Sequence, residues 1–157
     1  MKRTLKSLPY CFLLMLVFII GCSKSSEPET PNLPNADHYI TWNIDDNIQG
    51  SLTSPYDSLA SARYGTETNL VGIATSNKNS FLVQFNGNRS IGMYDVIYAI
   101  MWINGKNYYS NGPGFLQVNL SKYGDFDDDI IGSYSGNVKD SMGVLSKING
   151  NFKLKTR

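Results

Sequence analysis

Hydrophobic and polar residues divide the chain into three stretches with different patterns. From Tyr10 to Ile20 the residues are almost all apolar, and none is charged. From Ser23 to Asp37 the chain is polar and holds three of the six prolines. From His38 onward, short runs rich in Ile, Val, Phe and Tyr alternate with clusters of Asn, Gly, Ser and Asp. That alternation is typical of β-strands joined by turns, and it shows no sustained helical period.

The third stretch predicts an all-β fold, an antiparallel β-sandwich or barrel-like sheet of about nine to ten short strands. Its most apolar part is 97–103, and the Asn104-Gly105 dipeptide that follows favours a type I′ hairpin turn. Segment 58–64 also fits a short helix. The segments with the strand pattern are 38–44, 48–53, 58–64, 69–75, 80–85, 92–96, 97–103, 106–110, 115–120, 130–138 and 144–154.

The first stretch has the form of an export signal. A short cationic segment with Lys2, Arg3 and Lys6 precedes the apolar run. The run is well short of the ~20 residues that a membrane-spanning helix needs, which favours a secretory signal over an uncleaved signal anchor. It also lacks the periodic polar positions of a core helix.

The residues that close the apolar run, Ile19-Ile20-Gly21-Cys22, resemble the lipobox of bacterial lipoproteins. The resemblance implies cleavage between Gly21 and Cys22. It also implies that Cys22 carries an S-diacylglycerol and an N-acyl group, which would hold the protein to a membrane. The domains expected are therefore a signal peptide at 1–21, a disordered tether at 22–37 and a single all-β domain at 38–157.

Charge and cysteine content change once the leader is set aside. Three of the 14 basic residues leave with it, so 11 remain against 13 acidic ones. A nucleic-acid partner is not expected, because it calls for a basic surplus. Of the two cysteines, Cys11 lies in the leader and Cys22 is the predicted acylation site. No disulfide is expected, so the hydrophobic core alone must stabilise the domain.

The C-terminal block resembles the closing hairpin of a group of small Bacteroidetes envelope lipoproteins of unknown function. The residues that carry the resemblance are 129–143, with an Ile-Ile-Gly strand and a Lys-Asp turn, and 148–154, Ile-Asn-Gly-Asn-Phe-Lys-Leu. The chain has Ser133-Tyr134 where that group has Thr-Phe. The resemblance implies a β-sandwich lipoprotein domain on the cell envelope, and it implies no activity.

One acidic segment has the spacing of a calcium loop. Asp125, Asp127 and Asp129 follow the D-x-D-x-D pattern, but Ile130 and Gly136 replace the Gly and Glu that an EF-type loop needs at positions 6 and 12. An acidic, solvated turn is therefore favoured over a calcium site.

The remaining candidates are one histidine and a set of aromatic residues. His38 is the only histidine, so a zinc set is not expected, and a Ser–His–Asp triad would have to use it. A solvated residue at a strand start is favoured. Several aromatics could form a platform for a glycan, although in an all-β chain they serve first as core residues. They are Trp42, Trp102, Tyr108, Tyr109 and Tyr123.

We therefore expect a lipid-anchored envelope protein whose β-domain is a non-enzymatic binding or structural module without a cofactor or metal. The membrane is its partner through the acyl chains on Cys22, and a glycan or an envelope protein is a possible second one. No aspartate follows Cys22 in Ser23-Lys24-Ser25-Ser26, which favours the outer membrane. The alternative is a carbohydrate- or calcium-binding envelope domain.

Overall fold

The computed structural model describes residues 36–157 apart from 77 and 88–89, and this part of the chain consists of ten strands. The strands are β1 (Tyr39–Ile44), β2 (Ile48–Thr53), β3 (Ser58–Tyr64), β4 (Glu67–Ile73), β5 (Ser80–Phe85), β6 (Gly92–Ile103), β7 (Lys106–Asn111), β8 (Leu116–Tyr123), β9 (Asp129–Asp140) and β10 (Leu145–Lys155).

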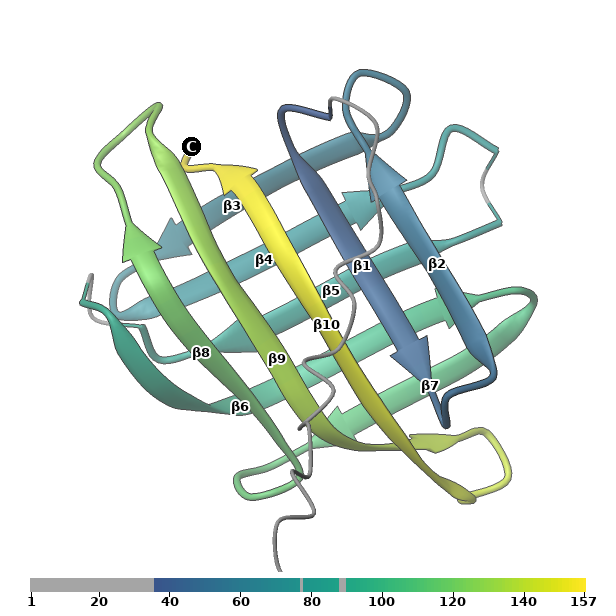
Figure 1. The fold of residues 1–157 in the computed structure, drawn as a ribbon. Coiled ribbons are helices and arrows are strands. Elements are labelled where there is room, and N and C mark those ends of the chain that lie inside the picture. Colours follow the sequence, from purple (N-terminus) through teal and green to yellow (C-terminus); the bar gives the residue numbers. More distant parts are fainter. Residues whose placement is uncertain (1–35, 77, 88–89) are drawn as a thin grey trace, which may run out of the picture. The chain divides into compact units, whose positions relative to one another are not determined.

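All ten strands belong to one antiparallel sheet folded into two layers. Its order is β2-β1-β10-β9-β7-β6-β5-β4-β3, and β8 pairs with both β6 and β9. Figure 1 shows β8, β9, β10, β1 and β2 in front, crossing over β3 to β7 behind them. We call these the front layer and the back layer. The all-β antiparallel prediction is confirmed, and the continuous sheet corresponds to the barrel-like form.

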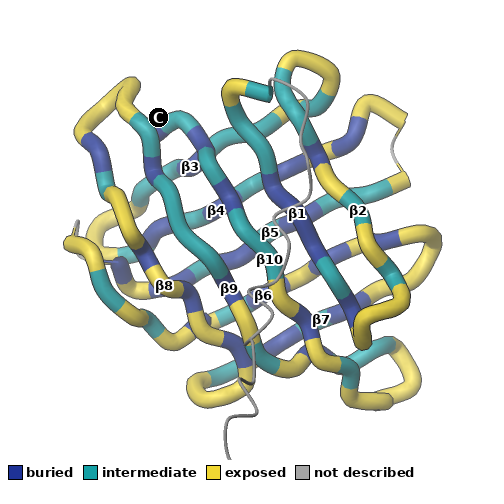
Figure 2. Tube along the Cα trace, in the orientation of Figure 1, coloured by how far each residue is buried: buried dark blue, intermediate teal, exposed yellow. Residues whose placement is uncertain are grey.

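The core lies between the layers because the strands alternate apolar and polar residues. In β1, Ile40 and Ile44 point inward, and in β5 every second residue from Phe81 to Phe85 does so. Figure 2 shows the buried positions recurring along the strands of both layers. All buried hydrophobic residues form a single cluster that runs from Ile40 to Leu154.

The sheet closes where the end of the chain meets β3. Thr156 forms an isolated parallel bridge with Ser61. The Arg157 backbone N–H donates to the Ser61 carbonyl at 2.9 Å, and the Ser61 hydroxyl donates to the Lys155 carbonyl at 3.2 Å. These bonds satisfy part of the β3 edge, which would otherwise present unpaired backbone groups to solvent.

Tyr134, on β9, contacts both a neighbouring part of the front layer and the back layer. Its side chain is buried, and its hydroxyl donates to the Thr41 carbonyl at 2.6 Å. Its ring lies 5.2 Å from the ring of Phe81, centroid to centroid, in the back layer. Burial raises the pKa of the Tyr134 hydroxyl, so it stays a donor.

Gly150 leaves the space that Tyr134 needs. A Cβ at position 150 would overlap the Thr41 carbonyl and the Tyr134 hydroxyl. The Thr41 carbonyl turns inward to accept from Tyr134. The backbone N–H of Asn151 donates to the Thr41 hydroxyl in its place, at 2.9 Å. Tyr134 is therefore a structural hydrogen-bonding residue.

Most predicted strands are confirmed, with some changes at their ends. Segments 48–53, 58–64 and 80–85 are observed as predicted, and 58–64 is a strand and not a helix. The strand predicted at 69–75 is observed at Glu67–Ile73, two residues earlier at both ends, and the tight turn before it ends at Thr66. The turn at Asn104 and Gly105 has positive φ at both residues, 50° and 81°, as a type I′ turn requires.

The segments 92–96 and 97–103, predicted as two strands, form one strand, β6. Its pairing with β5 shifts register between Gln84 and Phe85, where Tyr98 and Val96 are the partners. Ile97 is thus the extra residue of a bulge. The bulge lets β6 bend between the two layers, with its first half paired to β8 and its second half to β7.

Tyr134→Phe tests the role of the buried hydroxyl. We expect the free energy of unfolding to fall by about 1–3 kcal/mol, because the buried Thr41 carbonyl would lose its donor. Chemical denaturation measures the change. Tyr94→Phe is the matched control, since the Tyr94 hydroxyl donates to the Ser90 carbonyl at an exposed site. Equal losses in the two variants would contradict a special role for Tyr134.

Candidate functional site

The predicted anchor lies outside the described residues. Gly21, Cys22 and the whole signal peptide precede residue 36, and of the predicted tether only residues 36 and 37 are described. The candidate sites that the structure describes therefore lie in the β-domain.

Asp129, at the end of the acidic turn and the start of β9, forms two ion pairs. The Asp129 carboxylate lies 3.2 Å from Nε2 of His38 and 3.4 Å from Nζ of Lys153, so it joins the starts of β1 and β9 to β10. His38 is half-buried and paired, which corrects the prediction of a solvated histidine. Burial tends to raise the pKa of Asp129, but the His38 hydrogen bond and the Lys153 charge lower it overall.

Two further aspartates of the segment contact different lysines. Lys122 donates to Asp128 at 2.9 Å, and this hydrogen bond lowers the pKa of Asp128. Lys155 donates to the backbone carbonyl of Asp127 at 2.7 Å. Among the described residues there is no group of three or more His, Cys, Asp or Glu side chains placed to hold a metal ion. The geometry therefore does not assemble Asp125, Asp127 and Asp129 into a calcium site.

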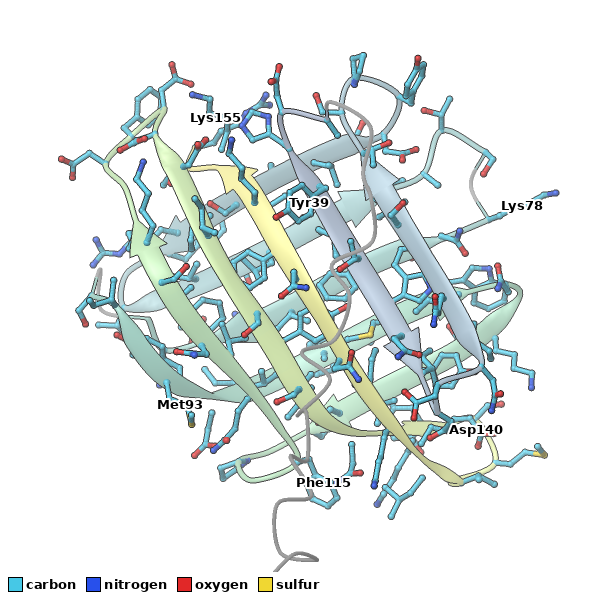
Figure 3. All side chains as sticks on the ribbon, viewed as in Figure 1. Tyr39, Lys78, Met93, Phe115, Asp140 and Lys155 are labelled. Carbon is cyan, nitrogen blue, oxygen red and sulfur yellow. The ribbon has the colours of Figure 1, made fainter. Side chains whose placement is uncertain are left out.

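A groove of about 440 Å³ lies beside this cluster, between the start of β1, the β2–β3 turn and the end of the chain. Figure 3 shows Lys155, one of its lining residues, at this end of the domain, with Phe115 and Asp140 at the opposite end. Asp57 in its wall already accepts from the backbone N–H groups of Thr53 and Thr75. The groove is lined by His38, Ser54, Pro55, Asp57, Ser58, Leu59, Ala60, Val71, Ile73, Lys155 and Arg157.

His38 and Asp129 would be two members of a Ser–His–Asp triad, for which the groove would have to supply the serine. Ser54 and Ser58 line it together with His38. The hydrogen bonds among the described residues include none from either serine hydroxyl to the imidazole. The second oxygen of Asp129 faces Lys153, which is the arrangement of a structural ion-pair network.

The five aromatic residues predicted as a possible glycan platform do not lie together. Trp42 and Tyr108 are buried in the core, each 4% exposed. Tyr123 is half-buried and its hydroxyl bonds to the Thr68 hydroxyl at 3.1 Å. Only Trp102 and Tyr109 lie on an outer surface, that of the back layer, where Trp102 is 38% exposed.

The outer face of the back layer is apolar. Strand register places one row of small, aliphatic and aromatic residues across all five strands, namely Ala60, Val71, Leu82, Ile100 and Tyr109. The row on one side contains Ile73 and Trp102 with Ser58, Ser80 and Asn107. The row on the other side is Ala62, Asn69, Gln84, Tyr98 and Asn111. None of these 15 positions carries a charge. We call them the apolar face.

The outer face of the front layer, in contrast, is polar. One row crosses its five strands as Gln117, Ser135, Asn149, Asn43 and Gln49. Next to it lie Asn119, Ser133 and Asn151, and then Thr41 and Ser51. Gln117, Ser135 and Asn149 are exposed to water, whereas the Thr41 side chain is buried and bonded to the Asn151 backbone. The two outer faces of one sheet thus differ sharply in polarity.

The sequence already held a signal for the apolar face. Ile97 to Ile103 is apolar at almost every position, which is typical of a strand covered on both sides. In the structure Ala99, Met101 and Ile103 point into the core, whereas Ile100 on the outer side is 39% exposed.

Comparison with protein-family models gives no match for this chain, and comparison with curated protein sequences gives none either. The resemblance to the Bacteroidetes envelope lipoproteins therefore stays a prediction from the sequence. In residues 36–157, with 77 and 88–89 left aside, no helix has the length and apolar character needed to cross a membrane.

Asp129→Asn tests the ion-pair cluster. Because the pKa of Asp129 is lowered in the folded protein, its carboxylate stabilises the fold above its unfolded pKa of ~3.9, and this contribution disappears as the pH falls through the lower folded value. We expect the variant to melt about 2–5 °C lower at pH 7 and no lower than wild type near pH 2. Thermal denaturation at both pH values measures this.

Asp127→Asn is the control for this experiment. Its carboxylate makes no ion pair with a described residue, and asparagine tolerates the positive φ of 64° at that position. A similar loss at pH 7 in both variants would show that the Asp129 contacts do not stabilise the domain.

Proposed function

We propose that the protein is a lipoprotein of the bacterial cell envelope, held to the outer membrane by acyl chains on Cys22. Its β-domain then acts as a non-enzymatic binding or structural module. The observation that carries the anchor is Ile19-Ile20-Gly21-Cys22, placed directly after a cationic segment and a short apolar run. Acyl chains contribute about 0.8 kcal/mol per buried CH₂, so more than one chain holds a protein stably on a membrane.

The arrangement of the β-domain supports a binding or structural role. Its interior is filled by one cluster of hydrophobic side chains, and His38 and Asp129 are joined to Lys153 in an ion-pair network. The feature left to interact with a partner is the apolar face, because large exposed apolar surfaces mark interaction sites.

Carbohydrate binding is the second candidate, because Trp102 and Tyr109 lie outward on the same sheet face. Aromatic rings of this kind stack on the apolar sides of sugars. The aliphatic side chains between them, Leu82 and Ile100, fit a protein surface better. Calcium binding is not favoured, because Asp129 and Asp128 are already paired with cationic side chains.

Cys22→Ser tests the anchor. In the bacterial host, wild type should incorporate labelled palmitate, lose its first 21 residues and remain with the membrane fraction. Cys22→Ser should stay unprocessed and unlabelled, because serine cannot form the thioether. Intact mass, palmitate labelling and fractionation measure the difference.

Cys11→Ser is the matched control, since Cys11 lies in the apolar run and is the only other cysteine. It should behave as wild type. A Cys22→Ser protein that is still matured and acylated, or a Cys11→Ser protein that loses its label, would contradict the proposal.

Thermal denaturation with added ligands tests the second candidate. We expect calcium to leave the melting temperature unchanged, because the Asp129 carboxylate gains nothing by exchanging His38 and Lys153 for the ion. A panel of envelope glycans would raise it only if the rings of Trp102 and Tyr109 bind sugar. A rise that Trp102→Ala abolishes would replace the protein-binding role by carbohydrate binding.

A further inference from the structure

We propose that the apolar face is the surface through which two copies of this chain pair, back layer against back layer, about a two-fold axis near Leu82. The pairing goes beyond the proposed anchoring and does not require it. The surface consists of the 15 outward positions of β3 to β7 defined above.

The apolar face has the composition of an interface core. Its exposed members include Ile73, Ile100 and Trp102, at 47%, 39% and 38% exposure. Aromatic residues are enriched and charged residues depleted at the centre of protein interfaces. Asn69, Asn107 and Asn111 border the apolar centre and supply hydrogen-bonding groups for a rim, where the Gln84 amide donates to the carboxylate of Glu67 at 2.7 Å.

The absence of charge at the centre of the face, with the Glu67 carboxylate at its border, is what favours a second copy over an unrelated partner. In a two-fold contact the same patch lies on both sides, so a charge near the axis meets its own sign. A surface that pairs with itself must therefore keep charges away from its centre, whereas a different protein can offer the opposite charge. Leu82 and its neighbours in register, Val71 and Ile100, are uncharged, so the centre of the face meets this condition.

The geometry of the face suits sheet-on-sheet packing. Inner faces of β-sandwiches pack as two sheets about 10 Å apart with interdigitating side chains. Two back layers would pack face to face outside the domain, as the front and back layers pack inside it. The two outer faces of the pair would then be polar front layers, which carry Gln117, Ser135 and Asn149.

The size of the face predicts a weak dimer. Five strands spaced ~4.8 Å apart and about six residues of each strand give a footprint of roughly 20 Å by 20 Å. With projecting side chains, two copies would bury on the order of 1,000 Å², the lower limit for a specific interface. We therefore expect a dissociation constant on the order of 10 µM.

Leu82 is the position at which charge tests the contact. It lies on β5, the central strand of the back layer, between Val71 and Ile100. Leu82→Glu and Leu82→Lys each bring like charges together across the axis, and each should weaken dimerisation at least ~10-fold. Equal amounts of the two variants should form a heterodimer, because opposite charges then meet.

The experiment uses the mature chain with Cys22→Ser, residues 22–157, which keeps every member of the hydrophobic cluster. Sedimentation equilibrium between about 1 and 100 µM should show wild type passing from monomer to dimer. Asn149→Glu and Asn149→Lys are the matched controls, since Asn149 lies on β10, the central strand of the front layer, and is exposed. They should dimerise like wild type.

A wild type that is monomeric throughout this range overturns the proposal, as does dimerisation that Leu82→Glu leaves intact. A mixture of the two Leu82 variants that stays monomeric also overturns the two-fold contact. Circular dichroism checks folding, and Ile100→Glu, at a more exposed position of the same row, repeats the test if a Leu82 variant unfolds.

Cysteine cross-linking gives an independent measurement. The chain beyond residue 22 contains no cysteine, so Leu82→Cys introduces a single thiol in the mature chain with Cys22→Ser. Mild oxidation should join two copies through position 82, whereas Asn149→Cys should remain largely monomeric. Equal cross-linking at both positions would show random collision and would contradict the proposal.

Discussion

The hydrogen bond from the Tyr134 hydroxyl to the Thr41 carbonyl is the interaction on which the arrangement of the β-domain depends. It fixes β9 against β1, while the Tyr134 ring packs on Phe81 in the opposite layer. Gly150 is required beside it, because any larger residue would occupy the same space. One buried tyrosine on β9 therefore contacts β1, β10 and the back layer together. With the interior filled in this way, interaction with a partner falls to the outer surfaces.

The polarity of these outer surfaces follows from the residues that alternate along the strands of each layer. In the front layer most inward apolar residues alternate with an amide, a hydroxyl or a charged side chain, with Ile131 and Leu145 as outward apolar exceptions, so the outer face is largely polar. In the back layer β4, β5 and β6 place apolar residues on both sides, as at Leu70 and Val71 or at Val83 and Leu82. Burial of apolar area is worth roughly 25 cal/mol per Å², so an uncovered face of this kind favours association. A weak contact suits a protein that we propose to be confined to a membrane, because confinement raises its effective concentration.

Local patterns were sufficient to predict the strands and the turn at Asn104-Gly105, because period-two alternation and positive-φ dipeptides act over a few neighbouring residues. They could not predict that 92–103 is one bent strand, since the bulge at Ile97 depends on pairing with β5, β7 and β8. The pairing of His38 with Asp129 joins residues 91 positions apart, which no local spacing indicates. The Asp-x-Asp-x-Asp pattern has the spacing of a calcium loop, but of its three carboxylates only that of Asp129 is ion-paired, and the described residues include no group of three placed to hold a metal ion. The sequence marked 97–103 as the most apolar run of the domain, but only the register shows which neighbours share its outer face.

The most direct test of the apolar face as a contact uses the two tryptophans that the chain already has. Trp42 is buried and Trp102 lies on the face, so iodide should quench mainly the fluorescence of Trp102. If two copies pair through the back layer, quenching of the wild-type mature chain should decrease as its concentration rises from about 1 to about 100 µM. Quenching that stays constant over this range would show that Trp102 remains exposed, and it would contradict the account.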